Sequence, residues 1–129
     1  MFDETLSQIA GALVEHCRNG TEDEGLATLY SADVVSVEAM TMPGGMDRTS
    51  TGMDALKAKH AWWEANAEVH SSSVEGPFLF EPDRFAVIFE MDVTMEQMGG
   101  RFEAKEVGIF TVADGKIVRE EFYYTPPPG

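Results

Sequence analysis

The carboxylate of Glu38 is the first candidate for chemistry in this sequence. It directly follows Val34–Val37, a short β-branched and largely apolar stretch that is typical of a strand. A carboxylate carried by such a strand into a dry pocket could accept a proton from a bound molecule near neutral pH. The alternative is a solvated carboxylate at the end of a strand, one of the 23 acidic residues of the chain. We predict a catalytic role for Glu38 and keep this alternative open.

His60 is the second candidate, because it lies on the apolar stripe of a predicted helix. The stripe comprises Met53, Leu56, His60, Trp63 and Ala67, whereas Lys57, Lys59 and Glu64 fall largely elsewhere on that helix. An imidazole that faces a pocket could act as an acid, a base or a hydrogen-bond donor. The pattern favours His60 as a catalytic residue and Trp63 as a ligand-binding wall. Packing in the core is the alternative for both.

A long period-two pattern in the second half of the chain predicts antiparallel strands. Large apolar residues alternate with polar or smaller ones from Phe85 to Glu96. Gly99-Gly100 and Asp114-Gly115 each resemble a two-residue hairpin turn. The strands that follow these turns are expected over Arg101–Val112 and Lys116–Tyr124.

These two turns define a strand register and, with it, a further set of candidate residues. Glu106 then lies beside Val93 and Tyr123 on the most apolar face. We predict ligand-binding residues on this face: Phe89, Met91, Glu106 and Tyr123. A one-residue bulge would exchange the faces of the strands. The alternative register brings inward Asp92, Glu120 and Tyr124.

Other kinds of site have little support in the sequence. His60 and Glu64 have the spacing of a metal-binding pair, but no third ligand is evident. Gly44-Gly45 lacks the lysine and the helix of a phosphate-binding loop. Ser71–Ser73 has no nucleophile elbow around it. We therefore expect neither a metal nor a cofactor.

The elements that must position these residues are helices first and strands afterwards. Apolar residues recur every three or four positions over Leu6–Cys17, and a shorter helix with Leu26, Leu29 and Tyr30 inward is expected after the capping-box spacing of Thr21 and Glu24. The third helix carries His60, and Val69–Phe80 is extended, with a bend at Gly76-Pro77. This order predicts an α+β fold. The 129 residues suit a single domain, 1–129, with a core over about 3–124 and a loose proline-rich tail over 125–129.

Composition limits the partners. The formal net charge is −14, which disfavours nucleic acids and anionic membrane surfaces. The single cysteine, Cys17, excludes an internal disulfide and is expected to be a buried structural thiol. No secretory signal and no membrane-spanning stretch is apparent, so a cytoplasmic location is expected.

Three segments together carry a resemblance to a known family. They are Leu29–Glu38, the helix start Gly52–Leu56, and the hairpin and closing strand Asp114–Tyr124. Their order and spacing resemble the SnoaL-like and ketosteroid-isomerase-like branch of the nuclear transport factor 2-like superfamily. The resemblance implies a cone-shaped, curved antiparallel sheet wrapped around three helices, a cystatin-like α+β barrel with a pocket between sheet and helices. It also implies pairing through the sheet as a homodimer.

The resemblance extends to individual positions. The general base of the steroid isomerases corresponds to Glu38. Their oxyanion donors, a tyrosine on the first helix and a protonated aspartate on the penultimate strand, correspond to Val14 and, within a residue or so, Val107. Neither valine side chain can donate a hydrogen bond. On the closing strand the resemblance favours the face of Phe122 and Tyr124.

Two functions fit these patterns. The first is a cofactor-independent isomerase, cyclase or dehydratase that acts on a small apolar cyclic molecule through Glu38 and His60. The second is a noncatalytic ligand-binding or dimerisation module of the same fold, which the two valines favour. An adaptor that binds proteins through its acidic surface ranks last.

Overall fold

The computed structural model describes residues 4–41 and 47–124. The proline-rich tail and Gly44-Gly45, on which the sequence carried expectations, lie outside these residues. The three helices are α1 (Glu4–Asn19), α2 (Glu22–Leu29) and α3 (Met53–Asn66), and a short 3-10 helix, η1, covers Glu96–Met98.

Six strands form one curved sheet. They are β1 (Tyr30–Val37), β2 (Thr49–Thr51), β3 (Glu68–Phe80), β4 (Arg84–Met95), β5 (Gly100–Ala113) and β6 (Lys116–Tyr124), in the order β2-β1-β6-β5-β4-β3. The predicted α+β class is confirmed. The sheet is open and mixed rather than wholly antiparallel, because β1 runs parallel to β6. The predicted bend in β3 is also present, as a register shift between Glu75 and Phe78.

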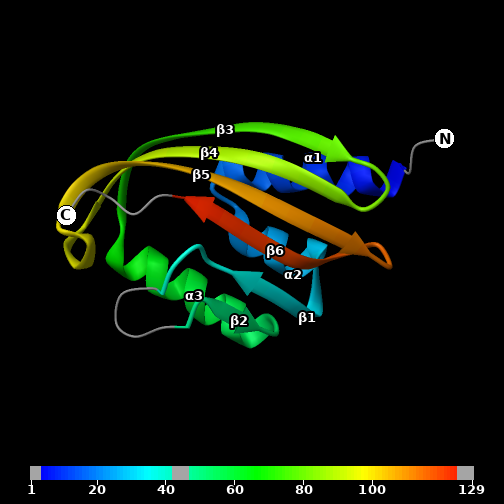
Figure 1. Cartoon of the computed structure of the whole chain (residues 1–129), viewed down its shortest axis with the longest axis horizontal. Helices are drawn as coiled ribbons and strands as arrows, with labels where there is room; N and C mark the ends of the chain where they lie inside the picture. The colour runs from blue at the N-terminus through cyan, green and yellow to red at the C-terminus, as the bar shows by residue number, and fades with distance from the viewer. Residues whose placement is uncertain (1–3, 42–46, 125–129) are drawn as a thin grey trace.

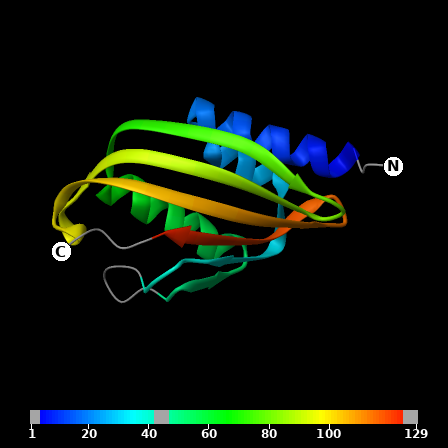
Figure 2. The ribbon, with the colours of Figure 1, turned by 45° about the horizontal axis from the view of Figure 1, so that its top comes forward.

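The helices lie together on one side of the curved sheet (Figures 1 and 2). The periodic apolar residues of α1 are buried there: Leu6, Ile9, Ala10, Leu13 and Val14. They pack with the inner face of the strands, where Phe85 and Phe110 stack with ring centroids 4.9 Å apart. The core thus forms on the side that the helices cover. None of the helices among residues 4–41 and 47–124 is both long and apolar enough to cross a membrane.

The predicted turn between β4 and β5 is wrong. Met95 pairs with Gly100, so η1 and Gly99 form a four-residue connection in place of the two-residue turn. Gly99 has φ 93°, a left-handed conformation that suits glycine, and its amide donates to the carbonyl of Glu96. The register differs from the predicted one by an even number of residues. The inner face of β4 is therefore the predicted apolar one.

A bulge interrupts the pairing of β5 with β6. The two-residue turn is present, because Ala113 pairs with Lys116 and Val112 with Ile117. Thr111 then pairs with Arg119, which leaves one extra residue on β6. Because side chains alternate along a strand, one extra residue exchanges the faces of everything that follows. The simple two-turn register is wrong for β6.

Candidate functional site

Two neighbouring strands place acidic residues beneath the helices. Val34 and Ser36 on β1 are fully buried, and Glu38, which follows the strand, is only 8% exposed. The solvated alternative for Glu38 is therefore wrong. β6 runs beside β1 and places Glu120, which is also buried, opposite Ser36.

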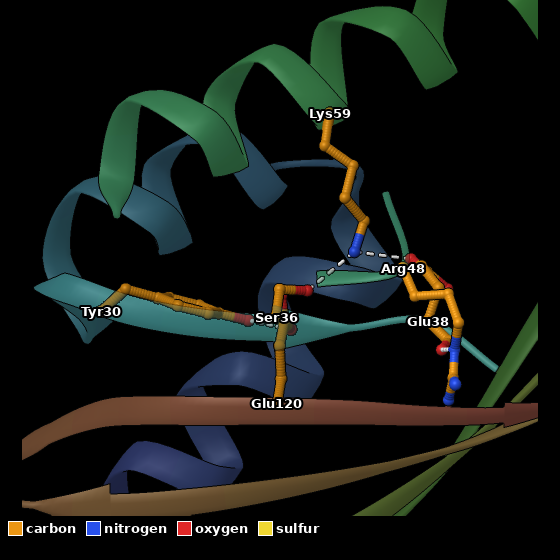
Figure 3. A network of polar contacts seen from close by, with 6 residues as sticks. All are labelled: Tyr30, Ser36, Glu38, Arg48, Lys59 and Glu120. Carbon is orange, nitrogen blue, oxygen red and sulfur yellow. Dashed lines mark hydrogen bonds and ion pairs between the residues drawn. The ribbon is translucent and has the colours of Figure 1, made fainter. Parts of the chain in front are cut away.

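Lys59 of α3 reaches down to this pair of strands (Figure 3). Its Nζ lies 2.5 Å from Oε1 of Glu38 and donates to Oγ of Ser36 at 2.7 Å. The Lys59 and Glu38 side chains are 11% and 10% exposed, so the ion pair is largely shielded from water. The ammonium also lies 5.2 Å from the centroid of the Phe122 ring.

The sequence placed Lys59 away from the inward stripe of α3, and that expectation is wrong. Lys59 is three residues after Leu56 and four before Trp63, which is the spacing of one helix face. Its position therefore indicated the inner face, whereas its charge argued for solvent. The aliphatic part of a lysine can cross apolar surroundings and deliver its charge to a polar group.

Glu120 is the most deeply buried acid in the described part of the chain, at 2% exposure. The hydroxyl of Tyr30 donates to its Oε2 at 3.0 Å, and the Ser36 side chain is also hydrogen-bonded to it. Burial raises the pKa of Glu120, while the charge of Lys59 and the two hydrogen bonds oppose that rise. Burial, followed by the charge of Glu120, raises the pKa of Tyr30.

The bulge on β6 brings Tyr124 inward. Tyr124 is hydrogen-bonded to Glu38, and its pKa is raised by burial and then by the charge of Glu38. It pairs across the strands with Glu106, so the predicted pairing of Glu106 with Tyr123 is wrong. Tyr123 lies 55% exposed on the other face and donates to Glu121. The alternative register is thus correct for β6, where Glu120 and Tyr124 face inward, and wrong for β4, where Asp92 lies on the outer face and pairs with Arg101.

Glu106 lies on the inner face of β5. Burial raises its pKa to about 7, and the charge of Glu38 adds to that rise. A large fraction of Glu106 is therefore a neutral acid near neutral pH and can donate a hydrogen bond. The resemblance had placed Val107 at about this position without a donor, but the residue that faces inward is Glu106.

Phe89 and Met91 lie on the inner face of β4 and are partly buried. Phe89 pairs across the strands with Glu106, and its ring lies 6.5 Å from that of Phe122. Met91 pairs with Ala104 further along the strand. Aromatic side chains therefore flank the acidic residues.

His60 and Trp63 are partly buried on α3. Burial lowers the pKa of His60, and the charge of Lys59 acts in the same direction. Within the described residues, no hydrogen bond or ion pair joins His60 to Glu38. The structure thus brings Lys59, rather than His60, against Glu38.

Two hollows on the described part of the molecule lie away from these acids. One is lined by Asp23, Leu26, Lys57, Ala61 and Glu64 of α2 and α3. The other is lined by residues 65–68 and by Thr94, Glu96 and Gln97. The residues of the described ranges contain no cluster of three or more histidine, cysteine, aspartate or glutamate side chains suited to a metal ion.

Comparison with known proteins identifies the family. The family model for the SnoaL-like domain matches residues 5–124. The chain belongs to the SnoaL-like family. A SnoaL-like protein from Mesorhizobium loti, provisionally assigned as a polyketide cyclase, is 40% identical; the match covers 92% of this chain and 97% of that one, with a TM-score of 0.83. No protein with a curated function matches the sequence.

More distantly related solved structures have the same fold as this SnoaL-like protein. A nuclear transport factor 2-like protein from Burkholderia xenovorans has 20% identity and a TM-score of 0.74, over 98% of this chain and 93% of that one. A protein with a ketosteroid isomerase-like fold from Catenulispora acidiphila also has 20% identity, with a TM-score of 0.64 over 97% and 88%. The predicted superfamily is confirmed.

Proposed function

We propose that this SnoaL-like protein is a cofactor-independent enzyme that moves a proton on a small, uncharged cyclic substrate, with Glu38 as the proton acceptor. The observation that carries the proposal is a shielded carboxylate held between a lysine ammonium and a tyrosine hydroxyl, Lys59 and Tyr124. Outside such a setting, burial of a charged carboxylate is costly. Buried ionisable groups with specific charged partners are typical of active sites, so this setting supports a catalytic role for Glu38.

The neighbouring groups suit the charge that such a reaction develops. Removal of a proton beside a carbonyl group leaves negative charge on the carbonyl oxygen. The ammonium of Lys59 and the protonated form of Glu106 are donors that can stabilise this oxygen. In this proposal Glu38 is the base and Glu106 is the acid, since two carboxyl groups in different environments can take opposite roles.

The apolar side chains around these groups favour an uncharged ring as substrate. Phe89 and Phe122 flank Glu106 and Lys59, and Met91 extends the same face. Neither of the two hollows is lined by these side chains, and in the proposal the side chains move apart when a ligand enters. His60 has no proton-transfer role in the proposal, since Lys59 occupies the position beside Glu38.

The proposal is tested by deuterium exchange. A panel of small cyclic ketones and lactones in heavy water is followed by proton NMR, which detects loss of the hydrogen beside the carbonyl even where no net product forms. We expect the protein to accelerate exchange for at least one member. We expect Glu38→Gln to lower that rate by about 10²- to 10⁴-fold, the contribution typical of a general base.

Glu90→Gln is the matched control, because Glu90 pairs with Lys105 on the exposed surface and is 56% exposed itself. It should leave the exchange rate unchanged. Full exchange activity in Glu38→Gln would remove Glu38 from its role, and the absence of exchange with every member of the panel would count against proton abstraction.

The noncatalytic alternative is favoured by Val14, which is buried on α1 where the isomerases carry a tyrosine donor. It makes a different forecast for the same panel. A ligand would raise the thermal unfolding temperature and be recovered with all its hydrogens.

We further propose a homodimer that forms through the uncovered face of the sheet, and a cytoplasmic location.

A further inference from the structure

The hydrogen bonds around Lys59 have only one possible direction. An ammonium group donates and cannot accept, so Oγ of Ser36 must accept from Lys59. The hydroxyl proton of Ser36 is then free to be donated, and Glu120 is the carboxylate to which Ser36 is hydrogen-bonded. A directed chain therefore runs from Lys59 through Ser36 to Glu120.

Glu120 receives a second hydrogen bond from the opposite side. The hydroxyl of Tyr30 donates to Oε2 of Glu120, and both residues are at least nine-tenths buried. The strand register supports this arrangement, because Ser36 and Glu120 are direct neighbours on β1 and β6. Figure 3 shows the chain descending from α3 to β6.

This chain gives Lys59 two carboxyl partners, Glu38 in direct contact and Glu120 beyond the Ser36 hydroxyl. Glu38 contacts the Lys59 ammonium directly. Glu120 is hydrogen-bonded to the Ser36 hydroxyl, which accepts the second hydrogen bond of that ammonium. A lysine side chain loses much rotational freedom when it is fixed in one place. A donor that is already fixed needs no rearrangement when charge develops nearby.

We propose that Ser36 and Glu120 are positioning residues, which act through each other to hold the Lys59 ammonium beside Glu38. This inference rests on the proposed function, in which Lys59 stabilises the developing charge. Neither residue is assigned contact with the substrate. Tyr30 completes the chain by fixing the carboxyl group of Glu120.

The first test observes Lys59 directly and needs no substrate. Ammonium protons of lysines give proton–nitrogen NMR signals only where their exchange with water is slow. In the protein labelled with nitrogen-15 lysine, we expect a slow signal from Lys59, identified by its loss in Lys59→Met. Lys105, which is 66% exposed, should give none.

We expect Glu120→Gln to accelerate the exchange of the Lys59 ammonium protons about fivefold, which corresponds to the loss of about one hydrogen bond. Ser36→Ala should act similarly. Glu121→Gln is the control, because Glu121 is next to Glu120 in sequence but pairs with Arg119 on the other face. An unchanged Lys59 signal in both Glu120→Gln and Ser36→Ala would overturn the inference.

The second test uses the deuterium-exchange assay. For a substrate that the protein accepts, Glu120→Gln should lower kcat about fivefold and leave KM within about twofold, because the residue positions a donor and does not bind the ligand. A change in KM alone would overturn the positioning role. If no ketone exchanges while the variants still alter the Lys59 signal, the proposed function fails and the positioning chain stands.

Discussion

Folding turns Glu106 into an acid that titrates near neutrality. Its pKa rises from 4.5 to about 7, mainly through burial. The folded state therefore holds a proton that the unfolded state has already released at the same pH, and the stability from this group is lost as pH rises from about 4.5 through about 7. The free energy at stake is up to about 3 kcal/mol, at 1.36 kcal/mol for each pKa unit.

We expect Glu106→Gln to be more stable than the natural protein at about pH 8 and to have a flatter dependence of stability on pH between about 5 and 8. Urea unfolding at the two ends of this range measures the difference. Part of the slope should persist, because the pKa of Glu120 is also raised. Glu103→Gln, an exposed change on the same strand, should keep the full slope; an equally flat curve in both variants would contradict the assignment.

At the scale of single residues, the sequence predicted one partner of the Lys59–Glu38 ion pair but not the other. Glu38 could be found because it follows an apolar strand. Lys59 could not, because the charge of its side chain outweighed its helical spacing beside Leu56 and Trp63. Only the three-dimensional arrangement shows that an inward lysine meets an inward glutamate, since β2 lies between β1 and α3 in the chain and the sequence does not specify how this connection places the helix.

Elements determine which of the predicted strand residues reach the site. Alternation predicted the inner face of β4 correctly, and the family resemblance predicted the inner face of β6. Turn chemistry alone failed for Tyr123, because a single extra residue on β6 reverses every later side chain. A bulge has no reliable sequence signal in this strand. The α+β order of helices and strands was predictable, since it depends on periodicity over many residues.

Gly108 allows two aromatic rings to approach the backbone of β5. A β-carbon at this position would lie 2.8 Å from Phe110 and 3.2 Å from Phe122. Phe110 is 1% exposed and stacked on Phe85, so its ring has little room to move. We expect Gly108→Ala to destabilise the protein by about 1–3 kcal/mol, the range for overpacked cores.

Gly11→Ala is the contrasting variant for the same unfolding measurement. Gly11 lies within α1, and an added β-carbon there meets nothing within 4 Å. Alanine should stabilise the helix by about 0.5–1 kcal/mol. Since Phe122 also lies beneath the Lys59 ammonium, Gly108→Ala should lower deuterium exchange as well. Equal stability of the two variants would show that the rings near Gly108 adjust freely.

At the scale of the whole molecule, the helices cover one face of the sheet and leave the other uncovered (Figure 2). Among the exposed large apolar side chains, the strand register places Phe78, Phe80 and Tyr123 on this uncovered face. Exposed large apolar side chains on an uncovered sheet face are a feature of many interfaces. The net charge of −14 opposes association of two copies, so an interface must bury enough apolar area to overcome that repulsion.

Tyr123 offers the sharpest test of the proposed homodimer. It is 55% exposed and lies on β6, which is an inner strand of the six-stranded sheet. Tyr123→Glu places a like charge in each copy, and we expect sedimentation to show a shift from dimer to monomer while deuterium exchange persists, since the side chain points away from Glu38. Ala61→Glu adds the same charge to an exposed position of α3 and should leave the dimer intact. A dimer that survives Tyr123→Glu must form through another surface, whereas loss of the dimer in both variants would assign the effect to total charge.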